Sequence, residues 1–259
     1  GEPGFIQIDS PTQITIYPTN PDTLVEQLQP GSAIGLLGIM LDSRRRNRLN
    51  GIVTLIDDRR ITIAITESFG NCPKYIQQRE FSLVATPMKT QSTTGTRLTE
   101  PLLGLIKQSD TLFIASSHSD AAGQYGADVS HRGGNPGFVH VDESGDLLMP
   151  DFPGNRHFNT LGNLIRNPSA GFLFIDFEHG HLLQVNGQVS IELETDFPGA
   201  ERLVRFRPES WRLQKNALPF RGELLKMSPF LETPLLPSLP GTQSIVNTSL
   251  GTLVTFGST

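Results

Sequence analysis

The stretch GNPGFVHVD at residues 134–142 decides the fold, because the chain opens on a close relative of it, GEPGFIQID at residues 1–9. Both stretches carry Gly, Pro-Gly-Phe and a final Asp at the same places, and the last five residues alternate in the same way. One short match has little weight alone. It raises the question of whether the chain contains the same unit twice.

Further matches follow in the same order along the chain. At an offset of 136, GLLGIML (residues 35–41) lies over GFLFIDF (171–177), and NGIV (50–53) lies over NGQV (186–189). Ordered matches over about 75 residues indicate an internal duplication. We therefore expect two similar units in tandem.

Each unit has the pattern of a β structure with one short helix. Alternating or β-branched runs, such as GIVTLI and GFLFIDF, are separated by Gly, Asn and Asp, which predicts strands joined by turns. A short helix is expected at DTLVEQLQP (residues 22–30) and at NTLGNLIRNP (159–168), where the proline ends it. The expected fold class is mainly β with short helices.

The second unit includes a strand, TLFIASS (residues 111–117), and a turn, DVSHRGG (128–134), that have no counterpart in the first. An open sheet edge is normally covered. We therefore expect the first unit to be incomplete, Gly1 to be a cut point, and a matching segment of roughly 30–60 residues to precede it in the natural protein. The expected divisions are a partial unit at 1–87, a polar connector at 88–108, a second unit at 109–227 and a Pro/Ser/Thr/Gly-rich tether at 228–259.

Composition excludes several functions. With 21 basic and 26 acidic residues the net charge is −5, which gives no general attraction to nucleic acid or anionic membranes. No apolar run is long enough to span a bilayer. The single cysteine, Cys72, cannot form an internal disulfide, so we expect a cytoplasmic location. The six histidines show no metal-binding spacing, and no metal is expected.

Residues 128–187 resemble the FMN-binding split barrels related to pyridoxamine 5'-phosphate oxidase. The resemblance is carried by a strand pair around GNPGFVHVD, a polar segment that enters a short helix, an NP stop, the strand GFLFIDF and a strand that ends in NG. Members of that family hold FMN between two subunits. The resemblance implies that two tandem split β-barrel units form an intramolecular pseudo-dimer with FMN between them.

The candidate cofactor residues combine this resemblance with anion chemistry. A turn and a helix start offer donors that suit a phosphate, with a solvated turn and ordinary helix capping as the alternatives. Gln184 matches a strand residue that contacts flavin in the family, and the alternative is a glutamine that faces solvent on an alternating strand. The stretch FGNCPKYIQQR would complete the site if it is helical, and the alternative is a solvated helix face. The candidates are Ser130, His131, Arg132, Asn155, Asn159, Thr160, Asn163, Gln184, Asn71 and Lys74.

The run Arg44 to Arg46, with Arg48, has two interpretations. It is most simply a solvated hairpin end, and the alternative is a phosphate grip across the interface between the units.

The function implied is FMN-dependent redox chemistry with a small-molecule substrate or an electron donor such as NAD(P)H. PGNRHFNTLGN has one arginine, whereas pyridoxamine phosphate oxidases are rich in Arg and Lys, which argues against that substrate. No residue stands out as catalytic. The alternatives are a flavin or haem module that binds or senses without turnover, and a flavin domain of a larger electron-transfer protein. Homodimerisation is left open.

Overall fold

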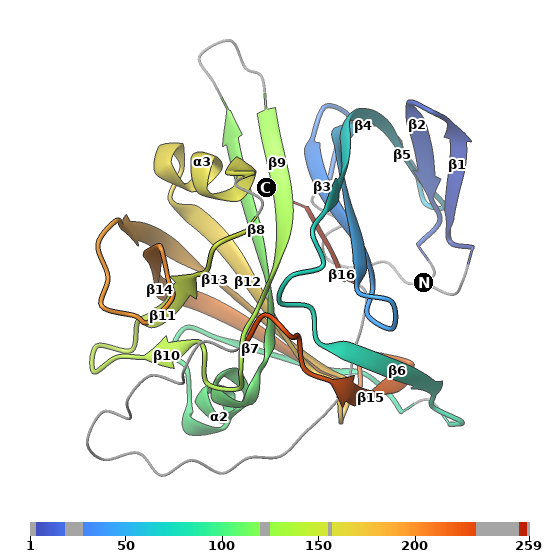
Figure 1. Ribbon diagram of the computed structural model, residues 1–259. Coiled ribbons are helices and arrows are strands. Elements are labelled where there is room, and N and C mark those ends of the chain that lie inside the picture. The colour runs from blue at the N-terminus through green and yellow to red at the C-terminus, as the bar shows by residue number, and fades with distance from the viewer. Residues whose placement is uncertain are drawn as a thin grey trace.

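The computed structural model describes residues 4–18, 28–86, 88–119, 125–154, 157–231 and 254–257. These residues form two antiparallel sheets, a two-stranded ribbon and two helices (Figure 1). The expectation of a mainly β chain with short helices is therefore confirmed. The described strand pairings form open paths rather than closed rings. The helix expected at 22–30 falls almost wholly outside the described residues.

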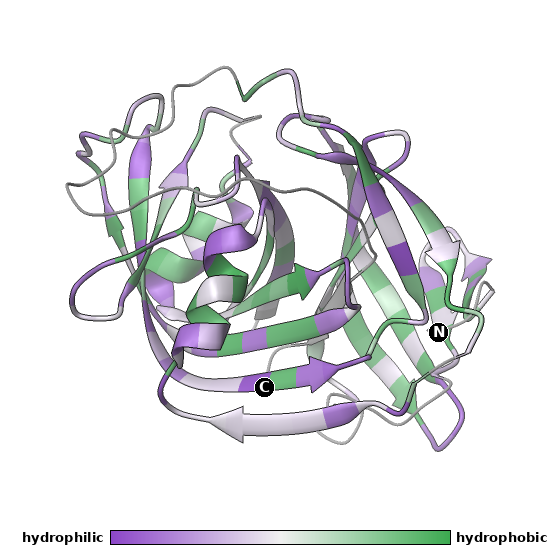
Figure 2. Cartoon of the chain, turned by 90° about the horizontal axis from the view of Figure 1, so that it is seen from below, coloured by the Kyte–Doolittle hydropathy of each residue, from purple (hydrophilic) through white to green (hydrophobic). Residues whose placement is uncertain are grey.

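The first sheet packs around a small apolar core that includes Ile14, Ile34, Val53 and Ile63. Hydrophobic and hydrophilic residues alternate along many strands, as Figure 2 shows, because successive side chains point to opposite faces. In spatial order the strands are β1 (Ile6–Ser10), β2 (Gln13–Ile16), β5 (Ile61–Asn71), β4 (Arg45–Ile56), β3 (Ala33–Met40) and β16 (Val254–Gly257).

The second sheet is larger and packs against both helices, α2 (Glu100–Gln108) and α3 (Asn159–Arg166). Leu161 and Leu164 put the apolar side of α3 into the core, and the helix ends before Asn167, where a proline follows. The strand order is β10 (His140–Val141), β11 (Leu147–Asp151), β14 (Arg202–Lys215), β13 (His181–Glu192), β12 (Ser169–Asp176), β8 (Thr111–Ser119) and β9 (Tyr125–Gly133).

Two hairpins in different sheets have the same register. Gly35 of β3 lies opposite Asn50 of β4, and Gly171 of β12 lies opposite Asn186 of β13, which is the offset of 136 read from the sequence. The pairing of β4 with β5 slips after Asn50, and that of β13 with β14 slips after Asn186. GLLGIML and GFLFIDF therefore occupy like elements.

A third apolar cluster joins the two sheets. Leu37 and Ile39 of β3 pack with Phe113, Val129 and Leu173 of the second sheet. The two backbones are also close, because a Cβ built on Gly35 would lie 3.0 Å from backbone atoms of Asp128 on β9. Strand β3 thus lies against β9 in one continuous interface (Figure 1).

Two of the expected divisions differ in the structure. Residues 88–108, which we expected to be a polar connector, contain two packed elements, since β7 (Gln91–Gly95) pairs with β14 and α2 buries Leu102 and Ile106. The tail also has packed parts: Ser228 is 4% exposed, and β16 pairs with β3. Unsatisfied backbone groups at a sheet edge favour such pairing even in a tail of low apolar content.

We predict that Gly35→Ala destabilises the fold, whereas Gly38→Ala on the same strand is nearly neutral. The added methyl at position 35 meets the Asp128 backbone at 3.0 Å, while at position 38 the nearest atom is 3.9 Å away. Overpacking of this kind costs about 1–3 kcal/mol of unfolding free energy. Urea denaturation of both variants measures it, and equal stabilities would contradict the close approach of β3 to β9.

Candidate functional site

A pocket that opens to solvent lies between the two sheets. Its walls come from β4 and the turn after β5 on one side, and from β9, the end of β11 and the start of α3 on the other. We call it the arginine cavity, because four arginines line it. The lining residues are Arg46, Arg48, Cys72, Tyr75, His131, Arg132, Gly133, Phe138, Pro150, Asp151, Phe152, Gly154, His157, Phe158, Leu161, Glu201 and Arg202.

Strand alternation divides the arginine run on β4. Arg45 and Asn47 are exposed, whereas Arg46 and Arg48 face the arginine cavity. Arg44 precedes the strand with a positive φ of 53°, and its Nη2 donates to the carbonyls of Lys226 and Met227. The prediction that this arginine run is a solvated hairpin end is therefore only partly correct. Arg45 is exposed, but Arg46 and Arg48 face the arginine cavity.

Arg48 is held by an acid of the other unit. Its Nη1 donates to both carboxylate oxygens of Asp128 at 3.0 Å, and both side chains are buried. Burial lowers the pKa of Arg48, and the Asp128 carboxylate opposes that shift. The hydroxyl of Thr160, at the start of α3, donates to the same carboxylate. Asp128 thus connects β9, α3 and β4.

Arg132 and Arg202 share one acid on the far wall. Arg132 contacts Oδ1 of Asp151, and Nε of Arg202 donates to Oδ2 at 2.9 Å. Arg202 also contacts Glu201. Both guanidinium groups are therefore compensated within the protein.

Arg46 differs from the other three, because no carboxylate is among its described partners. Its Nε donates to the Cys72 carbonyl at 3.2 Å, and its Nη1 donates to the His131 carbonyl and to Nδ1 of His131 at 3.1 and 2.9 Å. Burial lowers the pKa of Arg46 to about 10, and the group stays charged at neutral pH. Among the described residues no carboxylate pairs with it.

His131 is buried as a neutral imidazole. Burial and the neighbouring Arg46 hold its pKa well below the usual value. Because a guanidinium only donates, Nδ1 must accept the bond from Arg46, so the proton of the ring is on Nε2. His131 therefore presents an N–H group at Nε2.

Several donors at the arginine cavity have no partner among the described residues. They are Nε of Arg48, Nε of Arg132 and Nε2 of His131, all buried. A buried donor without an acceptor costs about 1–3 kcal/mol, so such groups usually meet water or a ligand. The Arg48 donor belongs to β4 and the other two belong to β9, so unpartnered donors border the cavity on both sides.

Aromatic rings complete the walls. Tyr75 lies 5.6 Å from Phe152 between ring centroids, and His157 stacks on Phe69 at 5.6 Å. Tyr75 has a positive φ of 64°, which is unusual for a large side chain. Its hydroxyl donates to the Pro153 carbonyl at 2.9 Å, and burial raises its pKa. The rings give the cavity flat apolar surfaces.

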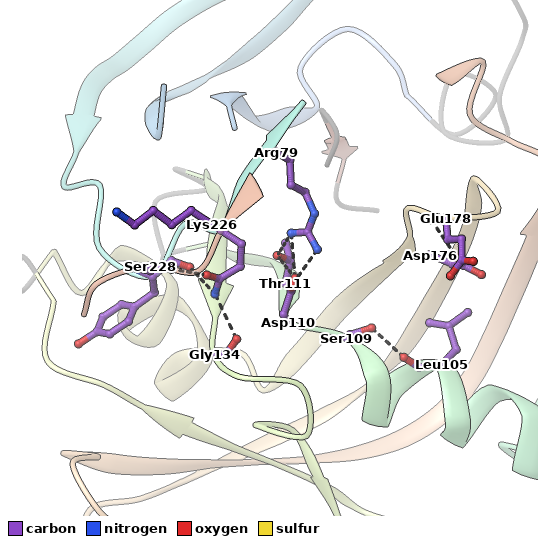
Figure 3. Close-up of polar contacts among 12 residues, drawn as sticks. Arg79, Leu105, Ser109, Asp110, Thr111, Gly134, Asp176, Glu178, Lys226 and Ser228 are labelled. Carbon is purple, nitrogen blue, oxygen red and sulfur yellow. Dashed lines mark hydrogen bonds and ion pairs between the residues drawn. The ribbon is translucent and has the colours of Figure 1, made fainter. Parts of the chain in front are cut away.

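A second buried ion pair joins the units beside the cavity. Arg79 of β6 (Gln78–Leu83) donates to both oxygens of Asp110 at 2.9 and 2.7 Å, and the Thr111 hydroxyl also contacts Asp110 (Figure 3). Strand β6 pairs with β15 (Phe220–Lys226). The helix considered for FGNCPKYIQQR is wrong, because β5 ends at Asn71, β6 begins at Gln78 and a turn without helix joins them.

The structure brings only some of the predicted site residues together. His131 and Arg132 line the arginine cavity, and Thr160 lies behind it on Asp128. Asn155 lies outside the described residues. The others are not among the lining residues: Ser130 is buried on β9, Asn159 begins α3, Asn163 bonds Ser116, Gln184 is on β13, Asn71 pairs with Arg46 in the β ladder, and Lys74 lies over Phe230.

The predicted site residues did not include Arg46, Arg48 or Tyr75, although a phosphate grip across the interface was the alternative interpretation of the run that contains Arg46 and Arg48. The duplication contained a usable signal for one of them, since the offset of 136 places Gln184 over Arg48. We predicted that Gln184 of the second unit contacts the flavin. The residue that lines the arginine cavity is instead Arg48, which is its counterpart in the first unit.

Two classes of site have no support within the described part of the chain. There, no helix has the length and apolar character needed to cross a membrane. In the same residues, no three His, Cys, Asp or Glu side chains are grouped to hold a metal ion.

Comparisons with known proteins give no family. No protein-family model matches the chain, and no curated protein does. Among solved structures, a point variant of HupZ from Group A Streptococcus is 14% identical, covers 44% of this chain and 98% of its own, and has a TM-score of 0.35. HupZ itself is 12% identical, with coverages of 51% and 98% and a TM-score of 0.34. Likeness at this level carries no argument about fold or function.

We predict that His131→Asn makes stability less dependent on pH between about pH 5 and 7. The unfolded chain gains a proton on this histidine near pH 6.5, whereas the folded chain does not, so the wild-type protein loses stability as the pH falls. Asparagine keeps an acceptor for Arg46 but removes this proton uptake. Denaturant titrations at several pH values measure the slope, which should coincide with wild type above pH 7. An unchanged slope below pH 7 would mean that His131 is not held neutral.

Proposed function

We propose that the arginine cavity binds FMN and that the protein is an FMN-dependent oxidoreductase. The observation that carries the proposal is the charge of Arg46, which lies in the cavity wall with no carboxylate among its described partners. A desolvated charge is costly unless it is paired. An anion supplied by a ligand is the missing partner.

A phosphate monoester fits this wall. Arg46 can donate to phosphate oxygens, and charge-assisted bonds of this type are about twice as strong as neutral ones. Arg48 and Arg132 each keep an unpartnered Nε at the same cavity. Their carboxylate partners hold these two guanidinium groups in a fixed orientation but leave the Nε–H donor of each without a partner.

The remaining surfaces suit the rest of FMN. The ribityl hydroxyls and the ring carbonyls are acceptors for the N–H groups that have no partner, including Nε2 of His131. The rings of Tyr75 and Phe152 offer apolar faces to a flat heterocycle.

When bound, FMN supplies the redox chemistry, and the chain supplies position and electrostatics. Arg46 and Arg48 would hold the phosphate end, and His131 would donate one neutral hydrogen bond. Glu201 and Arg202 lie on the side of α3, where a small redox substrate or NAD(P)H would approach. We assign no proton donor in the reaction.

The arrangement also supports the proposal of a pseudo-dimer. We infer that the two units are copies of one duplicated split-barrel unit, because their hairpins share register and the position of the bulge. The arginine cavity draws residues from both units, as a cofactor groove between two subunits would.

Haem is the alternative ligand, and His131 is not free to ligate its iron, although His157, Tyr75 and Cys72 also line the cavity. Iron needs a nitrogen with a free lone pair, but Nδ1 of His131 faces Arg46 and Nε2 carries the proton. A flavin, in contrast, accepts hydrogen bonds through its ring carbonyls, and the protonated Nε2 of His131 can donate one. A flavin module without turnover is the second candidate. It differs from the oxidoreductase only in that an electron donor would not reduce its bound flavin faster than it reduces free FMN.

We predict that Arg46→Met weakens FMN binding by roughly 10- to 150-fold, because a charge-assisted contact contributes about 1.5–3 kcal/mol. Arg45→Met is the matched control, since Arg45 is the exposed neighbour on the same strand. Isothermal titration with FMN measures both affinities. If the two variants bind equally well, Arg46 is not the phosphate partner.

We further predict that NADH or NADPH reduces the bound flavin in anaerobic stopped-flow measurements, faster than it reduces free FMN. The protein positions the ring and the donor together, which raises their effective concentration. Tight FMN binding without any faster reduction by either donor would favour the module that binds without turnover.

A further inference from the structure

The last described strand, β16, pairs with the edge of β3 (Figure 1). The pairing is antiparallel and places Val254 opposite Leu37, Thr255 opposite Leu36 and Gly257 opposite Ile34. A strand from the far end of the chain thus completes the sheet built by residues 6–71.

The position of β16 in the first sheet is that of β8 in the second. The first sheet reads β1-β2-β5-β4-β3-β16, and the second reads β10-β11-β14-β13-β12-β8 before β9. Each strand of one order has a counterpart in the other, and all the pairings are antiparallel. Strand β16 therefore fills the place that we expected a strand upstream of Gly1 to fill.

The registers make this correspondence residue by residue. At the offset of 136, Leu36 corresponds to Phe172, and the residues opposite them are Thr255 and Ile114. Matching Thr255 to Ile114 aligns TLVTFGS (residues 252–258) with TLFIASS (111–117). The two stretches share Thr-Leu at the start and Ser at the end. The backbone pairing and the sequence thus give the same alignment independently.

We propose that the edge of β3 is a strand-binding site and that its partner is the chain's own C-terminal strand, which replaces β8 in the first unit. Backbone hydrogen bonds drive this kind of strand addition, and the site covers an edge that would otherwise invite aggregation. The 22 residues between Leu231 and Val254 tether the strand, so its effective concentration at the edge far exceeds that of a second copy. The proposal is independent of the flavin.

The test is a disulfide between residues that the register places opposite each other. In a Cys72→Ser background, we combine Leu36→Cys with Thr255→Cys, since residues directly opposite in antiparallel strands have Cβ atoms close enough for a disulfide. Mild oxidation of the full chain should give a crosslinked monomer in most molecules. Non-reducing gels and peptide mass spectrometry identify it.

The control combines Leu36→Cys with Phe256→Cys, because Phe256 pairs with Gly35 and a cysteine there would point to the other face of the sheet. A yield no higher than that of this control would overturn the proposal. A crosslinked dimer would also overturn it, since the partner would then be a second copy.

Hydrogen exchange of the unmodified chain keeps the test decisive if Leu36→Cys fails to fold. The peptide covering residues 250–259 should exchange much more slowly than an unstructured peptide, because β16 donates to the β3 backbone. Exchange of that peptide at the unstructured rate would contradict the docking of β16.

Discussion

The ion pair between Arg48 and Asp128 is the constraint on which the arginine cavity depends. It joins the first unit to the second in a buried part of their interface, next to the point where Gly35 meets the Asp128 backbone. Removing one partner of such a pair leaves a buried charge and costs about 3–5 kcal/mol. The pair therefore disfavours other arrangements of the sheets, and the Arg79–Asp110 pair acts in the same way at the other side.

With the units fixed in this way, the cavity is asymmetric. The offset of 136 maps Arg46 and Arg48 onto Leu182 and Gln184 of the second unit. Leu182 packs at the apolar interface, and Gln184 lies on β13. The duplicated position thus has no cation, which explains why we assign a single anion site to the described chain.

Much of the local structure was predictable, because strand patterns and the internal repeat are local signals. The repeat offset of 136 predicted the shared register of the two hairpins. The Asn-Pro pair at residues 167–168 predicted where α3 ends. The missed features depend on contacts between distant residues. Arg46 and Arg48 acquire their roles only when β4 meets β9, and β16 docks on a strand more than 200 positions away. The approach of β4 to β9 has no local signal, whereas the likeness of TLVTFGS to TLFIASS was a usable signal for the place of β16.

Native mass spectrometry of the purified full chain tests the central claim most directly, because it identifies and counts any small molecule that the protein retains. The account predicts one FMN per chain, held in the single cationic cavity between the two units. Two flavins per chain, or retention of haem in place of FMN when both are supplied, would contradict it.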